Sequence, residues 1–313
     1  MFSFRKNKYH SSKHNNINTP LQSEDEKPSS IAARVRELEI KSKRLTTHLF
    51  TGEYHSAFKG RGMLFKEVRE YEAGDDIRFI DWNTSARMNG TYSKLFEEER
   101  ELSVYLLIDT SASNFFGTHK QSKKDLITEI SAAIAFSAAS NNDKVSLIFF
   151  SDKIEKYIPE KKGREHVLRI VRELLTFKPT SAKTDIDKAL RFLNATTKHK
   201  SIVFILSDFV DDNYQRTLGI ASKKHDVIGI QVFDILDKSF PRIGVVEMYD
   251  PETNQTILFD TDDKFSRLHY TKQFDTIVGT AKENFKKSGA DLLEIETGQD
   301  FVKILQQFFL RRK

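Results

Sequence analysis

Cysteine is absent from the 313 residues of this sequence. Disulfides and thiolate-bound metal centres are therefore excluded, which agrees with a reducing compartment. No apolar run approaches the roughly 18–20 residues that a membrane-spanning helix needs. The N-terminus, Met-Phe-Ser-Phe-Arg-Lys-Asn-Lys, has no apolar stretch of the kind found in secretory signals. Together these absences predict a cytoplasmic protein without a stable membrane span.

The sequence also has little net charge once its two ends are set aside. Its formal charge is +5, from 50 basic and 45 acidic residues. With the basic residues of the two ends removed, acidic residues outnumber basic ones. A face that binds nucleic acid should be visibly basic, so we expect no nucleic-acid partner. The basic residues of the two ends are Arg5, Lys6, Lys8, Lys13, Arg311, Arg312 and Lys313.

A tail and a helix are expected before the main body of the protein. Residues 1–28 are rich in Asn, Ser, Lys and His and poor in aliphatic side chains, which predicts a disordered tail. Ser29 or Ser30 is expected to cap the following helix. The apolar residues of that helix keep helical spacing and are Ile31, Val35, Leu38, Leu45 and Leu49.

A small β-rich module is expected after this helix, so that residues 29–101 form one N-terminal unit. Glycines punctuate short strand-like runs at 63–71 and 77–81. Asn89 and Gly90 lie between two further runs and predict a tight hairpin.

Residues 102–313 are expected to form one α/β domain, because strand-like and helical patterns alternate along them. This alternation predicts a doubly wound, mostly parallel sheet with helices on both faces. Hydrophobic residues make up 38% of the sequence, which is enough for such a core. The expected strands are 103–108, 144–151, 154–158, 202–206, 226–233, 242–249 and 291–295, and the expected helices are 122–140, 163–176, 185–197, 212–224, 263–287 and 299–310.

Three oxygen-bearing side chains follow the first strand of this domain. Asp109, Ser111 and Ser113 occupy alternating positions at the carboxyl end of the buried run 103–108. Open α/β sheets bind their ligands at that edge. Side chains that offer only oxygen suit a hard cation such as Mg²⁺. The spacing therefore predicts a metal site after this strand.

Two further segments add oxygen ligands that the topology can bring to the same edge. Thr184 precedes the helix 185–197 and is expected to be its N-cap, with an exposed hydroxyl. The apolar strand 202–206 ends in Ser207 and Asp208. Each residue has a simpler interpretation, since serine and threonine cap helices and aspartate favours turns. Their occurrence together and in this order favours a metal site.

Two resemblances sharpen this prediction. Asp109, Ser111 and Ser113, then Thr184, then Asp208 resemble the metal-ion-dependent adhesion site of von Willebrand factor A domains. Residues 60–87 read Gly-Arg-Gly-Met-Leu-Phe-Lys-Glu-Val-Arg-Glu-Tyr-Glu-Ala-Gly-Asp-Asp-Ile-Arg-Phe-Ile-Asp-Trp-Asn-Thr-Ser-Ala-Arg and resemble the signature of the DUF58 family of bacterial proteins. The similarity covers about residues 30–310.

The resemblance implies that residues 102–313 form a von Willebrand A-like domain with a non-catalytic binding function. It implies Ser111 and Ser113 as direct ligands of Mg²⁺ or Mn²⁺, Thr184 as a direct or water-bridged ligand, and Asp109 and Asp208 as ligands of the ion or of its waters. The last ligand would be a carboxylate of a client protein. The family is usually encoded beside a MoxR-type AAA+ ATPase, which is therefore the expected partner in assembly or maturation of clients.

Two positions depart from the pattern of such sites. Lys183 stands where a glycine often precedes the threonine, and Asn114 stands where methionine is frequent. Neither change removes a ligand oxygen. The charge of Lys183 is expected to lower the affinity for a cation.

A second polar cluster lies in the N-terminal unit. It could dock the ATPase, but ion pairs and turn contacts that fix the β-rich module against the sheet are the simpler interpretation. The single tryptophan in it is expected to pack in a core or a domain interface. The cluster consists of Asp75, Asp76, Arg78, Asp81, Trp82 and Arg87.

Catalytic alternatives find little support in the sequence. The nine histidines show no metal-binding spacing, and neither a nucleophile elbow nor a phosphate-binding loop is present. A Mg²⁺-dependent phosphohydrolase of the haloacid-dehalogenase type needs a second acid two residues after Asp109, where Ser111 stands. A metal-chelatase-like subunit stays open, because some chelatases pair an AAA+ motor with a von Willebrand A domain.

Overall fold

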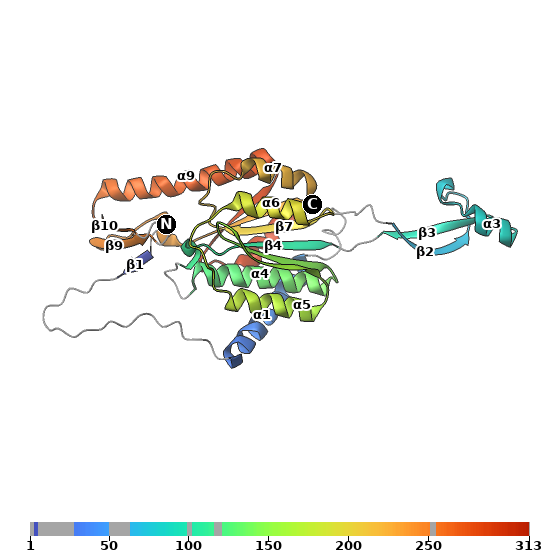
Figure 1. Ribbon diagram of the computed structural model, residues 1–313, viewed down its shortest axis with the longest axis horizontal. Coiled ribbons are helices and arrows are strands. Elements are labelled where there is room, and N and C mark those ends of the chain that lie inside the picture. Colours follow the sequence, from blue (N-terminus) through green and yellow to red (C-terminus); the bar gives the residue numbers. More distant parts are fainter. Residues whose placement is uncertain are drawn as a thin grey trace.

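The structure is a computed structural model, and it describes residues 3–5, 28–49, 63–98, 102–115, 121–250 and 255–312. Its centre is a six-stranded sheet (Figure 1). Five strands of this sheet are parallel, and β6 is antiparallel at one edge. In spatial order they are β11 (Asp291–Glu296), β8 (Asp226–Phe233), β7 (Ile202–Ser207), β4 (Ser103–Asp109), β5 (Lys144–Phe150) and β6 (Ile154–Lys161).

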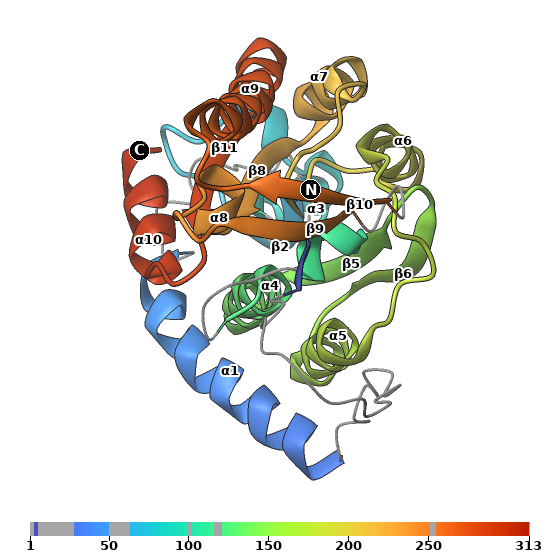
Figure 2. The ribbon, with the colours of Figure 1, turned by 90° about the vertical axis from the view of Figure 1, so that its left-hand side faces the viewer.

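Helices cover both faces of the sheet, as the end-on view of Figure 2 shows. Each face has its own cluster of buried apolar side chains. One face carries α4 (Lys123–Ser140), α5 (Arg164–Thr176), α10 (Phe301–Arg311) and, outside them, α1 (Pro28–Leu49), while the other carries α6 (Ile186–Thr196), α7 (Gln215–Lys224) and α9 (Lys264–Ser288). The predicted α/β fold class is therefore confirmed.

The central strands are apolar on both faces because helices cover both. Every residue of β7 is buried, and so is every residue of β4 after Ser103. Gly229 in β8 lets α9 approach the sheet closely. A Cβ at that position would lie 2.4 Å from Cζ of Phe285 and 2.8 Å from Cδ1 of Leu292. Glycine is thus required there by contact with a neighbouring helix.

A smaller sheet lies beyond the carboxyl ends of the parallel strands (Figure 1). It consists of β1 (Ser3–Arg5), β9 (Val245–Asp250) and β10 (Gln255–Asp260), all antiparallel. The strand expected at 242–249 corresponds to β9, whereas β10 was not predicted. Apart from Ser3–Arg5 and Pro28, the expected tail 1–28 lies outside the described residues.

The prediction of a tight hairpin at Asn89 and Gly90 is wrong, because these residues do not connect two paired strands directly. Strands β2 (Met63–Glu70) and β3 (Tyr92–Glu98) do pair, but a 3₁₀ turn η1 (Ile77–Phe79) and helix α3 (Trp82–Met88) lie between them. Aspartate side chains favour these helical turns, because Asp76 and Asp81 accept hydrogen bonds from backbone N–H groups at the two starts. Asn89 ends α3 in the left-handed conformation instead of forming a two-residue turn.

The polar cluster of this module makes contacts within the module. Arg69 pairs with Asp75 at 2.7 Å, and Arg78 pairs with Asp76 at 2.6 Å. Trp82 is 71% exposed, so the expectation that it packs in a core or a domain interface is wrong. Because β3 leads directly into the amino end of β4, the module and the predicted metal site lie at opposite ends of that strand (Figure 1).

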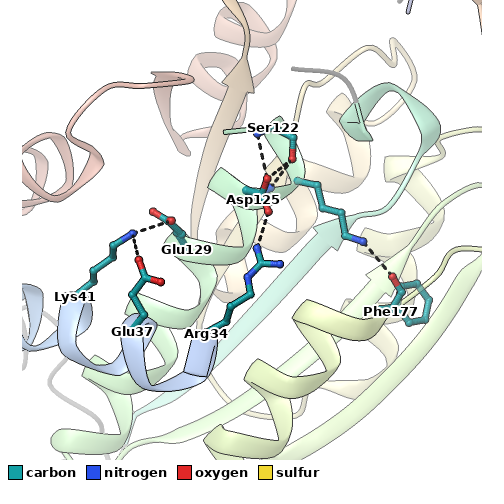
Figure 3. A network of polar contacts seen from close by, with 8 residues as sticks. Arg34, Glu37, Lys41, Ser122, Asp125, Glu129 and Phe177 are labelled. Atoms are coloured by element: carbon teal, nitrogen blue, oxygen red, sulfur yellow. Dashed lines mark hydrogen bonds and ion pairs between the residues drawn. The ribbon is translucent and has the colours of Figure 1, made fainter. Parts of the chain in front are cut away.

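Helix α1 is fastened to the outer face of α4 by ion pairs (Figure 3). Arg34 contacts Asp125 at 2.9 Å, and Lys41 contacts Glu129 at 3.0 Å. The helix begins at Pro28, so Ser29 and Ser30 lie inside it and neither is its cap. Proline suits a first helical turn because that turn leaves its N–H groups unpaired.

Candidate functional site

Two carboxylates meet at the carboxyl edge of the central sheet. Asp109 is the last residue of β4, and Asp208 directly follows β7. These strands are parallel neighbours, with Ile108 opposite Leu206, so their ends lie side by side. Asp109 is 2% exposed and Asp208 is 3% exposed. The edge therefore holds two carboxylates that are removed from water.

Hydroxyl groups and backbone N–H groups hold Asp109 in place. Its Oδ1 accepts a hydrogen bond from the backbone N–H of Ser111 at 2.9 Å, and its Oδ2 accepts one from Oγ of Ser207 at 2.6 Å. The Oγ atoms of Ser111 and Ser113 lie 3.0 Å apart, and both residues are buried. The structure thus brings Asp109, both serine hydroxyls and Asp208 to one edge, as predicted from their spacing.

The two carboxylates place negative charge close together at this buried edge. Burial first, and then the negative charge of Asp208, raise the pKa of Asp109. Within the described part of the chain, Oδ2 of Asp208 is buried without a hydrogen-bond donor. A buried acceptor without a donor and two adjacent buried carboxylates both favour the arrival of a cation.

Thr184 lies in the loop that leads into α6, and it is partly buried. The expectation that Thr184 caps α6 is wrong, because Asp185 does so by accepting a hydrogen bond from N–H of Lys188 at 2.8 Å. The loop is fastened to the serine turn by a hydrogen bond of 3.1 Å from N–H of Ala112 to the carbonyl of Ala182. Thr184 therefore lies two residues from a direct contact with the turn that carries Ser111.

A lysine that the motif did not reveal is buried beside Asp208. Lys123, the first residue of α4, is 0% exposed. Its Nζ lies 3.1 Å from Oδ2 of Asp237 and 3.7 Å from Oδ2 of Asp208. Asp237 belongs to α8 (Ile235–Lys238), directly after β8. Burial raises the pKa of Asp237, and the Lys123 charge opposes that rise.

The sequence did contain a signal for this lysine. Lys123 stands three and four residues before Leu126 and Ile127, which are buried on the sheet side of α4. A lysine on the apolar stripe of a helix is buried together with that stripe, and a buried lysine needs an acidic partner. Asp234 directly follows β8, in the same way that Asp109 ends β4. The partner Asp237 lies three residues further on, at the same strand end.

The donor set fits a hard divalent cation better than a soft one. It offers carboxylate and hydroxyl oxygens and no nitrogen or sulfur, which is the preference of Mg²⁺ and Mn²⁺. Within the residues that the structure describes, no group of three or more His, Cys, Asp or Glu residues is arranged to hold a metal. A metal at this edge therefore depends on the serine and threonine hydroxyls.

The arrangement of the central sheet defines the class of the protein. The strand order, the single antiparallel edge strand and the helices on both faces are those of a von Willebrand A-like domain. Residues 67–276 match the family described as "Protein of unknown function DUF58". This match spans more than half of the chain, so the protein belongs to the DUF58 family.

Relatives and solved structures resemble large parts of this chain. The chain is 28% identical over 290 residues to the uncharacterized protein Rv1480 of Mycobacterium tuberculosis, with 90% of each chain covered. The structure of BatB from Bacteroides thetaiotaomicron has a TM-score of 0.49 and 13% identity, covering 67% of this chain and 98% of that one. The SpRpn10 VWA domain has a TM-score of 0.36 and 10% identity, covering 68% and 95%. Because both TM-scores are below 0.5, the fold class is assigned from the strand order of the central sheet and not from these structures.

Among the described residues, no helix is both long enough and apolar enough to cross a membrane.

Proposed function

We propose that the protein is a non-catalytic interaction module that binds its partner through a divalent metal ion. The observation that carries this proposal is the pair of buried carboxylates, Asp109 and Asp208, beside the hydroxyls of Ser111 and Ser113. These four residues and Thr184 would hold Mg²⁺ or Mn²⁺. The bound ion would supply an electrophilic site for a carboxylate oxygen of another protein.

The residues of the chain prepare the site for this role. Ser207 and the N–H of Ser111 fix both oxygens of Asp109, so its orientation does not depend on the ion. The serine and threonine hydroxyls are neutral and add no negative charge to the ion, so the ion stays electrophilic. A partner carboxylate could therefore complete its coordination, which would make binding selective for acidic side chains.

A binding role accounts for the chemistry better than hydrolysis. Phosphohydrolases of the haloacid-dehalogenase type need an acid two residues after the strand-end aspartate, and Ser111 occupies that position. We propose that residues 102–313 form the metal-binding domain and residues 29–101 a separate N-terminal unit. We further propose a MoxR-type AAA+ ATPase as the partner, acting with this protein on a client that offers the carboxylate.

A pull-down with a metal chelator tests the proposal. Tagged wild type, Asp109→Ala and Asp212→Ala are used as bait in Mg²⁺ and in EDTA, with retained proteins identified by mass spectrometry. Asp212 is an exposed aspartate after β7, so its variant controls for loss of one negative charge. We expect an AAA+ ATPase to be retained by wild type and Asp212→Ala in Mg²⁺ only.

Direct metal binding separates the ion from the partner. Electron paramagnetic resonance of free Mn²⁺ should report one bound ion for wild type and for Asp212→Ala, and none for Asp109→Ala. Partner binding that persists in EDTA and in Asp109→Ala would show that the metal is not the bridge. Equal Mn²⁺ binding by all three proteins would remove Asp109 from the site.

A further inference from the structure

We propose that Lys123 is a resident counter-cation of the candidate metal site, which competes with the metal ion for Asp208 and sets the metal affinity. This inference rests on the proposed function, because it concerns the same edge of the sheet. It adds a residue that the adhesion-site pattern does not contain. It also explains how the edge can remain folded when no ion is bound.

The position of Lys123 is determined by the start of α4. Ser122 caps this helix, accepting a hydrogen bond from N–H of Asp125 at 3.1 Å, while the Asp125 side chain accepts one from N–H of Ser122. Lys123 is therefore the first helical residue, and its side chain is fully buried. An ammonium group in such a place requires acidic neighbours.

The two acidic neighbours of Lys123 differ in how tightly they hold it. The distance of 3.1 Å to Oδ2 of Asp237 is that of a charge-assisted hydrogen bond. The distance of 3.7 Å to Oδ2 of Asp208 is too long for a hydrogen bond and leaves only electrostatic attraction. Asp237 is thus the permanent partner of Lys123, whereas Asp208 can turn to another cation without breaking a hydrogen bond.

The number of carboxylates at this edge explains how it can hold both the Lys123 ammonium and a divalent ion. The strands β4, β7 and β8 all lead into aspartates at this edge, which are Asp109, Asp208, Asp234 and Asp237. The carboxylate of Asp234 accepts hydrogen bonds from two neutral groups, N–H of Leu236 at 3.0 Å and Oγ1 of Thr297 at 2.6 Å. The ammonium of Lys123 alone cannot balance these carboxylates, so the edge can accept a divalent ion in addition.

Two opposite effects on metal binding follow from this competition. A positive charge beside Asp208 repels an incoming divalent cation, so its removal should strengthen binding. If Asp237 is neutralised while Lys123 remains, the ammonium keeps its ion pair with Asp208 and should weaken metal binding. A purely structural role for Lys123 would not produce changes of opposite sign in these two variants.

The experiment measures Mn²⁺ dissociation constants for the full-length chain by electron paramagnetic resonance of the free ion. In Lys123→Met/Asp237→Asn we expect the constant to fall by about tenfold or more, because the competing charge is gone. In Asp237→Asn alone we expect it to rise by about threefold or more. Lys198→Met is the matched control, since Lys198 is exposed and precedes the amino end of β7, away from the site, and its change should stay below about twofold.

The outcomes distinguish this inference from the proposed function. Loss of Mn²⁺ binding in Asp109→Ala, together with unchanged constants in both Lys123 and Asp237 variants, would retain the metal site and overturn the role of Lys123. Absence of Mn²⁺ binding in every protein would overturn both. If the double variant does not fold, Asp237→Asn alone decides the matter, because unchanged or tighter binding in it contradicts the competition.

Discussion

Helix α4 carries ion pairs on two sides, and the two sets have the same chemistry but differ in their exposure to water. At its first turn, Lys123 is wholly buried against Asp237 and Asp208. On its outer face, Asp125 and Glu129 pair with residues of α1 while their side chains remain 38% and 21% exposed (Figure 3). The same type of contact therefore occurs in two dielectric environments on one helix.

The difference teaches that burial decides what an ion pair does. Water screens the outer pairs, and such pairs typically contribute about 0–1 kcal/mol. At the first turn neither charge can return to water, so the loss of one partner leaves the other uncompensated. We therefore expect the outer pairs to orient α1 and the buried group to govern both stability and ion binding.

The largest expected effect comes from breaking the buried group. Lys123→Met should lower the free energy of unfolding by about 3–5 kcal/mol in EDTA, because Asp237 loses its hydrogen-bonded cation. Urea denaturation followed by circular dichroism measures this. Saturating Mn²⁺ should recover part of the loss. A decrease below about 1 kcal/mol would mean that Asp237 and Asp208 are not held as charged groups.

A buried ionisable group without any partner should give the next largest effect. His225, which is the C-cap of α7 and directly precedes β8, is buried, and neither ring nitrogen has a hydrogen-bond partner among the described residues. Burial, with a smaller contribution from the Lys224 charge, lowers the pKa of His225 from 6.5 to about 4. The unfolded chain therefore binds a proton near pH 6.5, while the folded protein does so only near pH 4.

Stability should consequently fall as the pH decreases through this window. At pH 5 the folded state should have lost about 2 kcal/mol relative to pH 7.5 through His225 alone. Urea denaturation at both pH values should show this extra loss in wild type and not in His225→Leu. If the two proteins lose the same stability between these pH values, His225 is not held neutral by burial.

The capping box of α4 should contribute an intermediate effect. Ser122→Ala removes an acceptor for N–H of Asp125 and a donor of 2.7 Å to the Asp125 carboxylate. We expect the free energy of unfolding to fall by about 1 kcal/mol. Ser122→Thr keeps the hydroxyl and should cost less than half of that. Equal losses in the two variants would show that packing, not capping, is responsible.

The smallest effect is expected on the outer face. A double-mutant cycle of Lys41→Met and Glu129→Gln should give a coupling energy of about 0.2–1 kcal/mol, because both side chains remain partly exposed. The coupling should decrease further at high salt. A coupling as large as that of the buried group would contradict the comparison between the two sides of α4.

Much of the central sheet could be predicted from the sequence alone. The expected strand 226–233 has the bounds of β8, and the run 202–206 forms all but the last residue of β7. These segments are readable because parallel strands covered on both faces are continuously apolar. The juxtaposition of Asp109 and Asp208 was also predictable, since strand ends meet at one edge.

The rest depended on contacts that no local pattern encodes. Asn89 and Gly90 have the composition of a tight turn, but Asp81 starts α3 before them and changes the connection. Lys123 was missed because a charged residue near a helix start is usually exposed, although Lys123 lies on the buried stripe of α4 and pairs with Asp237, which is distant in the sequence. The assignment of Ser111, Ser113 and Thr184 as metal ligands stays a prediction.

The close approach of α9 at Gly229 has a use in genetics. Gly229→Ala would force Phe285 and Leu292 to move, in the middle of β8 and away from the strand ends. Such crowding in a packed core typically costs about 1–3 kcal/mol. An allele of this kind should behave as temperature-sensitive, reducing the amount of protein while leaving the strand-end aspartates chemically intact. It would let phenotypes caused by loss of the whole protein be compared with those of Asp109→Ala in the same cells.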